Sequence, residues 1–179
     1  PFTSSGITSQ IRYHKQESYF GGSMYSGAQY SIYVKASYQS TIIDTTKLYK
    51  IGLSYYGDRY DETLLLLRPS IPYVHEGLYA RTDQTLGAYT EFIISHSQRL
   101  SSIFGYRADY SKDFGLWHTP RLNMRYKPTD NTALRLSVGK TYRQANPISE
   151  NMSYLFSSRN LALEDYNSLK PEEAINYGA

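Results

Sequence analysis

The chain has 179 residues, a net charge of +3, 20 tyrosines, one tryptophan and no cysteine. The absence of cysteine excludes disulfide and thiolate chemistry, and the small charge without a basic run excludes a nucleic-acid-binding protein. Mean hydropathy is -0.54, and no run of about eighteen apolar residues predicts a membrane-spanning helix. The first residues lack an initiator methionine and an apolar signal core, so we expect a piece of a longer protein.

Alternation of apolar and polar residues predicts the strands of the first half. Weak alternation at 7–15 precedes clear strands at 28–39 and 47–57. Residues 16–27, rich in Gly, Ser and Tyr, are predicted to form a loop. Residues 58–84 contain two prolines, a charged cluster and four consecutive leucines, and they predict a second loop. Its length of about 27 residues suggests a functional loop rather than a plain connector.

The second half continues the same rhythm. Strands are predicted at 85–95 and 100–110, followed by a hairpin over 119–144 whose turn is 128–131. A long loop over 144–170, with at most one helical turn at 160–168, leads to a strand that is cut off at the end. The connectors alternate between short and long. This pattern is typical of an antiparallel up-and-down meander of about eight strands, so the predicted class is all-β.

The hairpin shows two contrasting faces, because side chains on a strand alternate with period two. Leu122 and Met124 share one face with the apolar residues of the second strand, and arginines fill the opposite face. Each strand has about the length that crosses a bilayer obliquely. Parity alone leaves open whether the apolar face lines the interior, as in lipocalin-like barrels, or the exterior, as in outer-membrane barrels.

Three observations favour an apolar exterior. Charges from three successive strands would gather on the polar face: Arg107, Asp109, Arg121, Arg125, Arg135 and Arg143. Tyrosines concentrate near strand ends, where aromatic girdles meet headgroups: Tyr38, Tyr49, Tyr55, Tyr110, Tyr126 and Tyr142. Short turns fall at one end and long loops at the other. A lumen rich in arginine needs water or a partner surface, which predicts a barrel larger than these strands.

One set of motifs resembles the barrel of TonB-dependent outer-membrane receptors. A turn is followed by a strand with the pattern Arg-x-Ser-x-Gly-x-x-Tyr-Arg, which starts at Arg135 and ends at Arg143. Leu169, Lys170, Pro171 and Glu172 match the element that follows the outer loop in this family. Residues 86–92 and 103–110 also fit. The resemblance covers about half of the chain, from 86 to 178. Within the family, the sequence is most similar in character to receptors from Bacteroides-type bacteria.

The resemblance implies a 22-stranded transmembrane β-barrel, of which residues 1–179 form a part, in the outer membrane of a Gram-negative bacterium. The plug domain, the TonB box and the final strands would lie outside this chain. The implied partners are the plug, the TonB complex that contacts it, outer-membrane lipid, a nutrient ligand and a surface lipoprotein. The implied function is energised import of a ferric siderophore, haem or cobalamin, with a glycan as the alternative cargo.

Two groups of site residues follow. Loop residues suited to a ligand surface are predicted because aromatic and guanidinium groups dominate binding hot spots: Tyr73, His75, Tyr79, Arg81, Arg143, Gln144, Asn146, Tyr154 and Arg159. Residues predicted to face the lumen and plug are Arg107, Asp109, Arg121, Arg125 and Arg135. Gly105, Ser137 and Gly139 would leave space for the plug. No catalytic residue, metal site or cofactor is predicted.

Other motifs give weaker signals. The triplet 139–141 resembles the end of a phosphate loop, but it lies in a strand and lacks the preceding glycine. The histidines lack metal-ligand spacing, His75 with Glu76 being the only close pair. Asp58, Asp61 and Glu62 suit calcium chemically, although a solvated charge cluster is the simpler interpretation. The leucines at 64–67 either pack inside a folded outer loop or contact a partner protein.

Three other functions stay open from the sequence. A passive porin or structural barrel would have the same strands and an open lumen. A soluble β-barrel binding module would bury Leu134, Leu136 and Val138 in its interior. An enzyme has the least support, because the polar positions follow strand parity instead of converging on one site.

Overall fold

Eight strands form one antiparallel sheet in the computed structural model, which describes all residues except 1–2, 43–45, 69–70, 145–149 and 151–169. Side chains at 67, 68 and 71–76 are also outside the description. The strands are β1 Thr3–Phe20, β2 Ser23–Thr41, β3 Lys47–Arg68, β4 Ile71–Ser95, β5 Leu100–Ser111, β6 Gly115–Thr129, β7 Thr132–Arg143 and β8 Glu172–Gly178. Among the described residues, no helix is long and apolar enough to cross a membrane.

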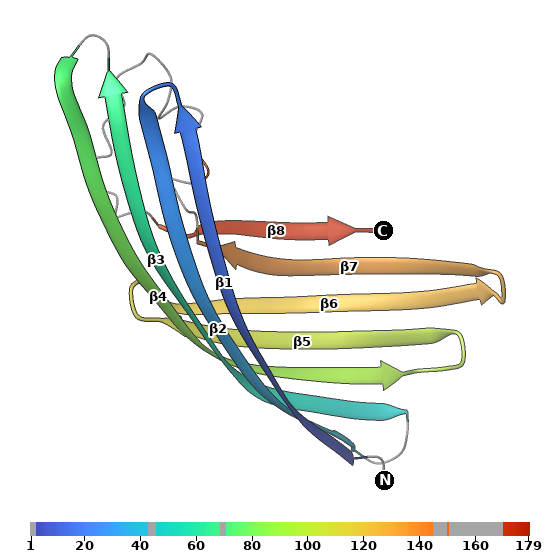
Figure 1. The fold of residues 1–179 in the computed structure, drawn as a ribbon. Coiled ribbons are helices and arrows are strands. Elements are labelled where there is room, and N and C mark those ends of the chain that lie inside the picture. Colours follow the sequence, from blue (N-terminus) through green and yellow to red (C-terminus); the bar gives the residue numbers. More distant parts are fainter. Residues whose placement is uncertain (1–2, 43–45, 69–70, 145–149, 151–169) are drawn as a thin grey trace.

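The strand order is the order of the sequence, so the sheet is an up-and-down meander (Figure 1). Each strand pairs antiparallel with the next, from Thr3 opposite Ser40 to Arg143 opposite Glu172. The end of the sheet where β2 ends and β3 begins, and where β4 leads to β5 and β6 to β7, is called the turn end. The opposite end, which carries the connection between β7 and β8, is the loop end. The predicted all-β meander is confirmed.

The two long loops predicted in the first half are wrong. Residues 16–27 belong to β1 and β2, which join at a two-residue turn where Gly21 has a φ of +62°. Residues 58–84 extend β3 and β4, whose pairing runs without a break from Lys47 opposite Ile94 to Leu66 opposite His75. Glycines and charges suggested loops, but the cross-strand ladder satisfies the backbone groups of these segments and keeps them extended.

The hairpin over 119–144 is confirmed, with a tighter turn than predicted. Thr129 pairs with Thr132, so only Asp130 and Asn131 form the turn. The register shifts between Tyr126 and Thr129, because Pro128 has no N–H to contribute to the ladder. The first strand of the hairpin also begins earlier than 119, since β6 already starts at Gly115.

One face of the sheet carries the apolar side chains and is exposed in this chain. Leu134 and Leu136 are 59% and 60% exposed, and Val138 and Met124 lie on the same face. Cross-strand pairs join apolar residues across the sheet, as in the row Ile7–Ala36–Leu53–Ala88. The opposite, polar face is hollowed by cavities that Arg107, Arg121 and their neighbours line. This arrangement contradicts a barrel with an apolar interior.

Aromatic pairs bound the apolar face at two levels. Tyr13 and Tyr30 have ring centroids 4.9 Å apart, and Tyr38 and Tyr49 have centroids 6.1 Å apart. Eight residues separate the two levels on β2, which at about 3.4 Å per residue is about 27 Å along a tilted strand. Beyond Tyr13 the same face carries the ion pairs Lys15–Glu17 and Arg59–Asp61. At the usual strand tilt of about 35–45° this length spans about 19–22 Å of height, most of the apolar band of about 25 Å in a transmembrane barrel.

Strands β1 to β4 continue past this band at the loop end and form a tall wall (Figure 1). On the polar face of this wall Leu64 and Leu66 are only 3% and 5% exposed, and Tyr25 is also buried. The four leucines therefore alternate within a strand instead of lying in a loop. Leu64 and Leu66 are buried, as expected for leucines that pack inward, but the folded loop predicted to hold them is wrong. The side chain at 67 is outside the described part.

The orientation of the faces can be tested with two arginine substitutions at adjacent positions in the complete protein. Val138→Arg places a guanidinium within the apolar band and should destabilise the folded barrel by about 2–4 kcal/mol. Ser137→Arg, on the hollowed face, should have a much smaller effect. Urea unfolding in lipid vesicles, followed by heat-modifiable gel mobility, would measure both. Equal losses for the two variants, or a larger loss for Ser137→Arg, would contradict the assignment of the faces.

Candidate functional site

An ion pair on the polar face of β5 anchors the site. The guanidinium of Arg107 contacts both carboxylate oxygens of Asp109 at 2.6 Å and donates to the Oγ of Ser54 at 2.8 Å. The pair lies directly on the backbone of Gly87, where an added Cβ would collide with both side chains. Gly87 is therefore required for the close approach, and β3, β4 and β5 together position the pair.

A second ion pair lies nearer the turn end. Arg121 on β6 contacts Glu91 on β4 by crossing the intervening Gly105, where an added Cβ would lie 2.6 Å from the Cγ of Arg121. Lys35 lies over the ring of Tyr89, 4.8 Å from its centroid. Gly105 was predicted to leave space for a plug, but the space next to it holds Arg121. Small residues on this face make room for neighbouring long side chains.

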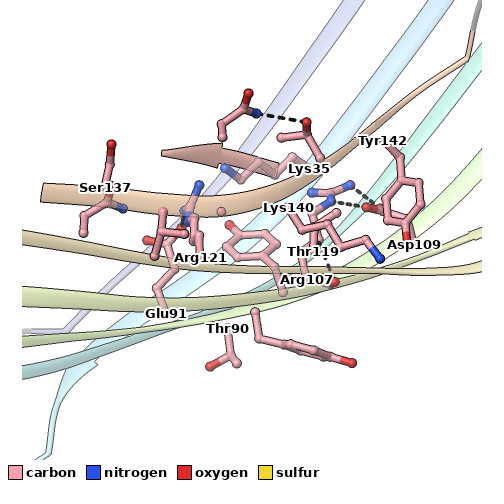
Figure 2. A pocket seen from close by; sticks show the side chains of 17 residues that line it. Lys35, Thr90, Glu91, Arg107, Asp109, Thr119, Arg121, Ser137, Lys140 and Tyr142 are labelled. Atoms are coloured by element: carbon pink, nitrogen blue, oxygen red, sulfur yellow. Dashed lines mark hydrogen bonds and ion pairs between the residues drawn. The ribbon is translucent and has the colours of Figure 1, made fainter. Parts of the chain in front are cut away.

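These groups line a cavity of about 550 Å³, which we call the middle cavity (Figure 2). Figure 2 shows Arg107 and Asp109 joined by their contacts, with Tyr142 and Lys140 close to them. Lys140 pairs with Glu173 at 2.6 Å and lies 4.9 Å from the centroid of the Tyr142 ring. Arg107, Arg121 and Lys140 thus each have a carboxylate partner within the sheet, whereas Lys35 lies over an aromatic ring.

A second cavity, of about 430 Å³, lies toward the loop end and is called the loop-end cavity. It shares Arg107, Asp109, Thr119 and Tyr142 with the middle cavity, so the two form one continuous hollow. Strands β2 to β7 all contribute to its lining. Its remaining walls are built around one buried carboxylate, one ion pair and one aromatic stack.

The buried carboxylate is Asp58, which is 3% exposed. Its Oδ2 accepts hydrogen bonds from Gln29 at 3.0 Å, from Tyr60 at 2.8 Å and from the hydroxyl of Tyr56. No described group donates to its Oδ1. Burial, together with the bond to Asp58 and its charge, raises the pKa of Tyr60, so this hydroxyl stays a donor. Three neutral donors thus hold one oxygen of this carboxylate.

The ion pair joins Arg81 and Asp83 on β4, with 2.9 Å between the guanidinium and the carboxylate. The guanidinium also lies over the ring of Tyr60, 4.6 Å from its centroid. Gln144, just after β7, donates to Asp83 at 2.9 Å. Two segments 61 positions apart in the chain therefore meet at Asp83. Both side chains are largely buried, so salt screens this pair less than it would an exposed ion pair.

The aromatic stack consists of Phe114, Trp117 and Tyr142. Ring centroids are 6.0 Å apart for Phe114–Trp117 and 5.6 Å apart for Trp117–Tyr142, with interplanar angles of 29° and 17°. The prediction that Tyr142 joins an outer girdle is therefore wrong. The pairing of β6 with β7 ends at Arg121 opposite Gly139, so Tyr142 is free of the ladder to β6 and stacks on Trp117.

The structure gathers some predicted residues and separates others. Arg81, Arg143 and Gln144 meet Arg107 and Asp109 at the loop-end cavity. Tyr79 lies over Gly77 on β4, outside both cavities. Side chains of Tyr73 and His75 are not described, and Asn146, Tyr154 and Arg159 lie outside the described residues. The ligand role of these residues stays a prediction.

Among the predicted lumen residues, Arg107, Asp109 and Arg121 line cavities on the polar face. Arg125 and Arg135 sit directly opposite each other on β6 and β7 and line neither the middle nor the loop-end cavity. Like charges placed opposite each other destabilise a sheet unless another group compensates them. An anionic surface facing this end of the sheet would compensate the two positive charges.

The weak metal signal at 58–62 is resolved by strand parity. Asp58 and Glu62 are buried on the polar face, whereas Asp61 pairs with Arg59 on the opposite face. The interpretation as a solvated cluster is wrong for the two buried carboxylates, and Glu62 accepts a hydrogen bond from Tyr25 at 2.7 Å. No group of three metal-ligating side chains occurs in the described part of the chain.

Sequence reasoning missed several residues that line the loop-end cavity: Tyr33, Tyr56, Asp58, Tyr60, Asp83, Trp117 and Tyr142. Most of them lie in segments predicted to be loops, where parity was not applied. Continuing the alternation of β3 through 58 and 60 places these residues on the polar face. Extending β6 back to Gly115 likewise places Trp117 on the same face as Arg121.

The dependence of the anchor on Gly87 can be tested by adding a side chain there. Gly87→Val should displace the Arg107–Asp109 pair and destabilise the barrel by about 1–3 kcal/mol, as overpacking does. Ala88→Val adds carbon on the apolar face of the same strand and serves as the matched control. The midpoint of urea unfolding would measure both changes. A Gly87→Val protein as stable as the control would show that the close approach is dispensable.

Comparison with known proteins identifies the family. The model of the TonB dependent receptor-like β-barrel matches residues 2–179. The structure resembles the copper transporter OprC with a TM-score of 0.61 at 11% identity, covering 97% of this chain and 32% of that protein. It resembles the ferric citrate transporter FecA in the unliganded form with a TM-score of 0.53 at 13% identity, covering 98% and 28%.

A third similar structure is the siderophore receptor PirA from Acinetobacter baumannii, with a TM-score of 0.53 at 13% identity, covering 80% of this chain and 26% of that one. At these identities the likeness concerns the fold. The chain spans between about a quarter and a third of the length of these three proteins. No curated protein gives a significant match. Because the family model covers nearly every residue, the chain belongs to the TonB-dependent receptor-like β-barrel family.

Proposed function

We propose that residues 1–179 form part of the barrel wall of an outer-membrane receptor that captures a scarce nutrient and imports it with energy from the TonB complex. The observation that carries this proposal is the hollowed polar face inside a family barrel. A sheet with an apolar exterior and cavities on its polar side suits a wall between lipid and an aqueous lumen. The location is then the outer membrane of a Gram-negative bacterium.

The remaining partners follow from the same proposal. Outer-membrane lipid covers the band between the two tyrosine levels. A plug domain from the same protein faces the polar side, where Arg125 and Arg135 oppose each other and call for an anionic neighbour. The TonB complex acts through that plug, and a surface lipoprotein is a further partner at the loop end. A likeness to Bacteroides-type receptors stays a prediction.

The ligand is expected to bind at the loop-end cavity, through Arg81, Arg143 and Gln144 with Arg107 and Asp109. These groups come from three different segments, β4, β5 and the end of β7, so the folded sheet is needed to bring them together. The family resemblance favours a metal chelate, such as a ferric siderophore, haem or cobalamin, and a glycan is the alternative. We propose binding and transport without a chemical step, because the polar groups form paired walls and not a nucleophile–base constellation.

The proposal can be tested by import in the organism that carries the complete gene. Deleting the gene, or removing the energy supply of TonB, should abolish uptake of the same nutrient. Growth with candidate ferric chelates or oligosaccharides as the limiting nutrient would measure this. A passive porin would instead retain uptake without TonB and conduct ions in planar bilayers. A soluble module would appear in the detergent-free fraction of the cell.

The role of the loop-end cavity can be tested within the same assay. Gln144→Ala removes a side chain that bonds Asp83, and it should weaken capture by about tenfold, the equivalent of one or two hydrogen bonds. Lys15→Ala, on the apolar face above the lipid band, is the matched control. Uptake at low nutrient concentration is the appropriate readout. Equal uptake by both variants would show that the loop-end cavity takes no part in ligand capture.

A further inference from the structure

We infer that the loop-end cavity contains a subsite for an ammonium group, formed by the phenol oxygens of Tyr56 and Tyr60, whose hydroxyl protons both go to the buried carboxylate of Asp58. This inference rests on the proposed function and names the chemistry of one group on the ligand of that cavity. Three features support it. They are a carboxylate without a cationic partner, two hydroxyl groups fixed as acceptors, and aromatic rings beside them.

The first feature is the charge balance of the cavity wall. The three guanidinium groups that line it each contact a carboxylate, in the pairs Arg81–Asp83, Arg107–Asp109 and Arg143–Glu172. Asp58 also lines the cavity, but it forms no ion pair with any described lysine or arginine. A buried charge without a partner is costly. An ammonium group in the cavity would supply the positive charge that the wall lacks at Asp58.

The hydrogen bonds of Asp58 show the same deficit. The side chain is 3% exposed, and all of its bonds converge on Oδ2, which accepts from Gln29, Tyr56 and Tyr60. No described group donates to Oδ1. Buried polar atoms in folded proteins nearly always have a partner, so a carboxylate satisfied at one oxygen calls for a further compensating group. A cation beside this network provides that compensation.

The second feature is the direction of the hydroxyl groups. A phenol has one proton to donate, and Tyr56 and Tyr60 both donate theirs to Asp58. Gln29 donates to the oxygen of Tyr60 at 3.1 Å, which leaves one further acceptor position on that oxygen. Both phenol oxygens can therefore only accept from a ligand. A primary ammonium group has three donors and no acceptor, so it matches this pair, whereas a carboxylate or phosphate does not.

The third feature is the aromatic surroundings of these oxygens. Tyr33 and Tyr56 lie directly opposite each other on β2 and β3, both line the cavity, and Tyr56 is 40% exposed. The guanidinium of Arg81 over the ring of Tyr60, at 4.6 Å, shows that this wall accommodates a cation against an aromatic face. A metal ion fits less well, because both phenols keep their protons and the described residues contain no group of three metal-ligating side chains.

The inference can be tested on the complete receptor purified in detergent, with two probes of the same shape. Para-fluorobenzylammonium is the cationic probe, and para-fluorobenzyl alcohol is the neutral one. Fluorine NMR line broadening during a titration gives the affinity of each. Wild type should bind the ammonium probe about tenfold more tightly than the alcohol, since a hydrogen bond from a charged donor is the stronger one.

Matched variants separate the subsite from general attraction and from folding. Asp58→Asn keeps the side-chain shape and removes the charge, so it should lower the preference for ammonium over alcohol by about tenfold. Asp61→Asn removes the same charge on the opposite face of β3 and should leave this preference unchanged. Tyr56→Phe should weaken binding of the ammonium probe severalfold, and Tyr55→Phe, on the apolar face, should not. The ratio of the two affinities is the readout, because a loss of folded protein would lower both affinities together.

Three results would overturn the inference. They are equal affinity of wild type for the two probes, an equal change of preference in Asp58→Asn and Asp61→Asn, and full ammonium binding by Tyr56→Phe. Any of these results in a receptor that still imports its nutrient with TonB energy would refute the ammonium subsite and leave the proposed function standing. Nutrient uptake that persists without TonB energy would instead refute the proposed function, whatever the two probes show.

Discussion

Pairing of every backbone group across one continuous sheet is the constraint on which this chain depends. In a lipid environment an unpaired N–H or C=O group costs several kcal/mol, so strands must be long, regular and joined edge to edge. Regular strands impose period-two parity, and parity sorts the side chains into an apolar face and a polar face. The two cavities, the ion pairs Arg107–Asp109, Arg121–Glu91 and Arg81–Asp83, and the aromatic stack lie on the polar face because the ladders from β1 to β8 hold the register.

On the polar face, long charged side chains pack directly against the backbone of glycines on neighbouring strands. Arg107 and Asp109 lie on Gly87, and Arg121 crosses Gly105 to contact Glu91. The guanidinium groups of Arg107 and Arg121 therefore reach carboxylates on the same strand and two strands away, and the cavity wall is polar without a large excess of charge. Such a surface orients a ligand through hydrogen bonds and shape more than through net attraction.

The fold was predictable from the sequence wherever alternation was uninterrupted. The hairpin of β6 and β7 and strand β5 were predicted within a few residues, because their apolar residues recur at every second position. The extensions of β1 to β4 were not, since their glycines and charges are typical of loops, and only the cross-strand ladder shows them to be extended. The site was predicted in part. Arg81 and Gln144 were chosen for their chemistry, but their meeting at Asp83 depends on contacts between distant segments, which periodicity does not encode.

The unequal height of the strands has a consequence for how a solute approaches. β3 and β4 have 22 and 25 residues, whereas β5 and β7 have 12 each, so the described rim slopes steeply from one side of the sheet to the other (Figure 1). The aromatic stack stands on the low side and the buried aspartate on the high side. A bulky solute that approaches over the low side contacts the flat rings first. The longer strands on the opposite side then limit its movement across the sheet.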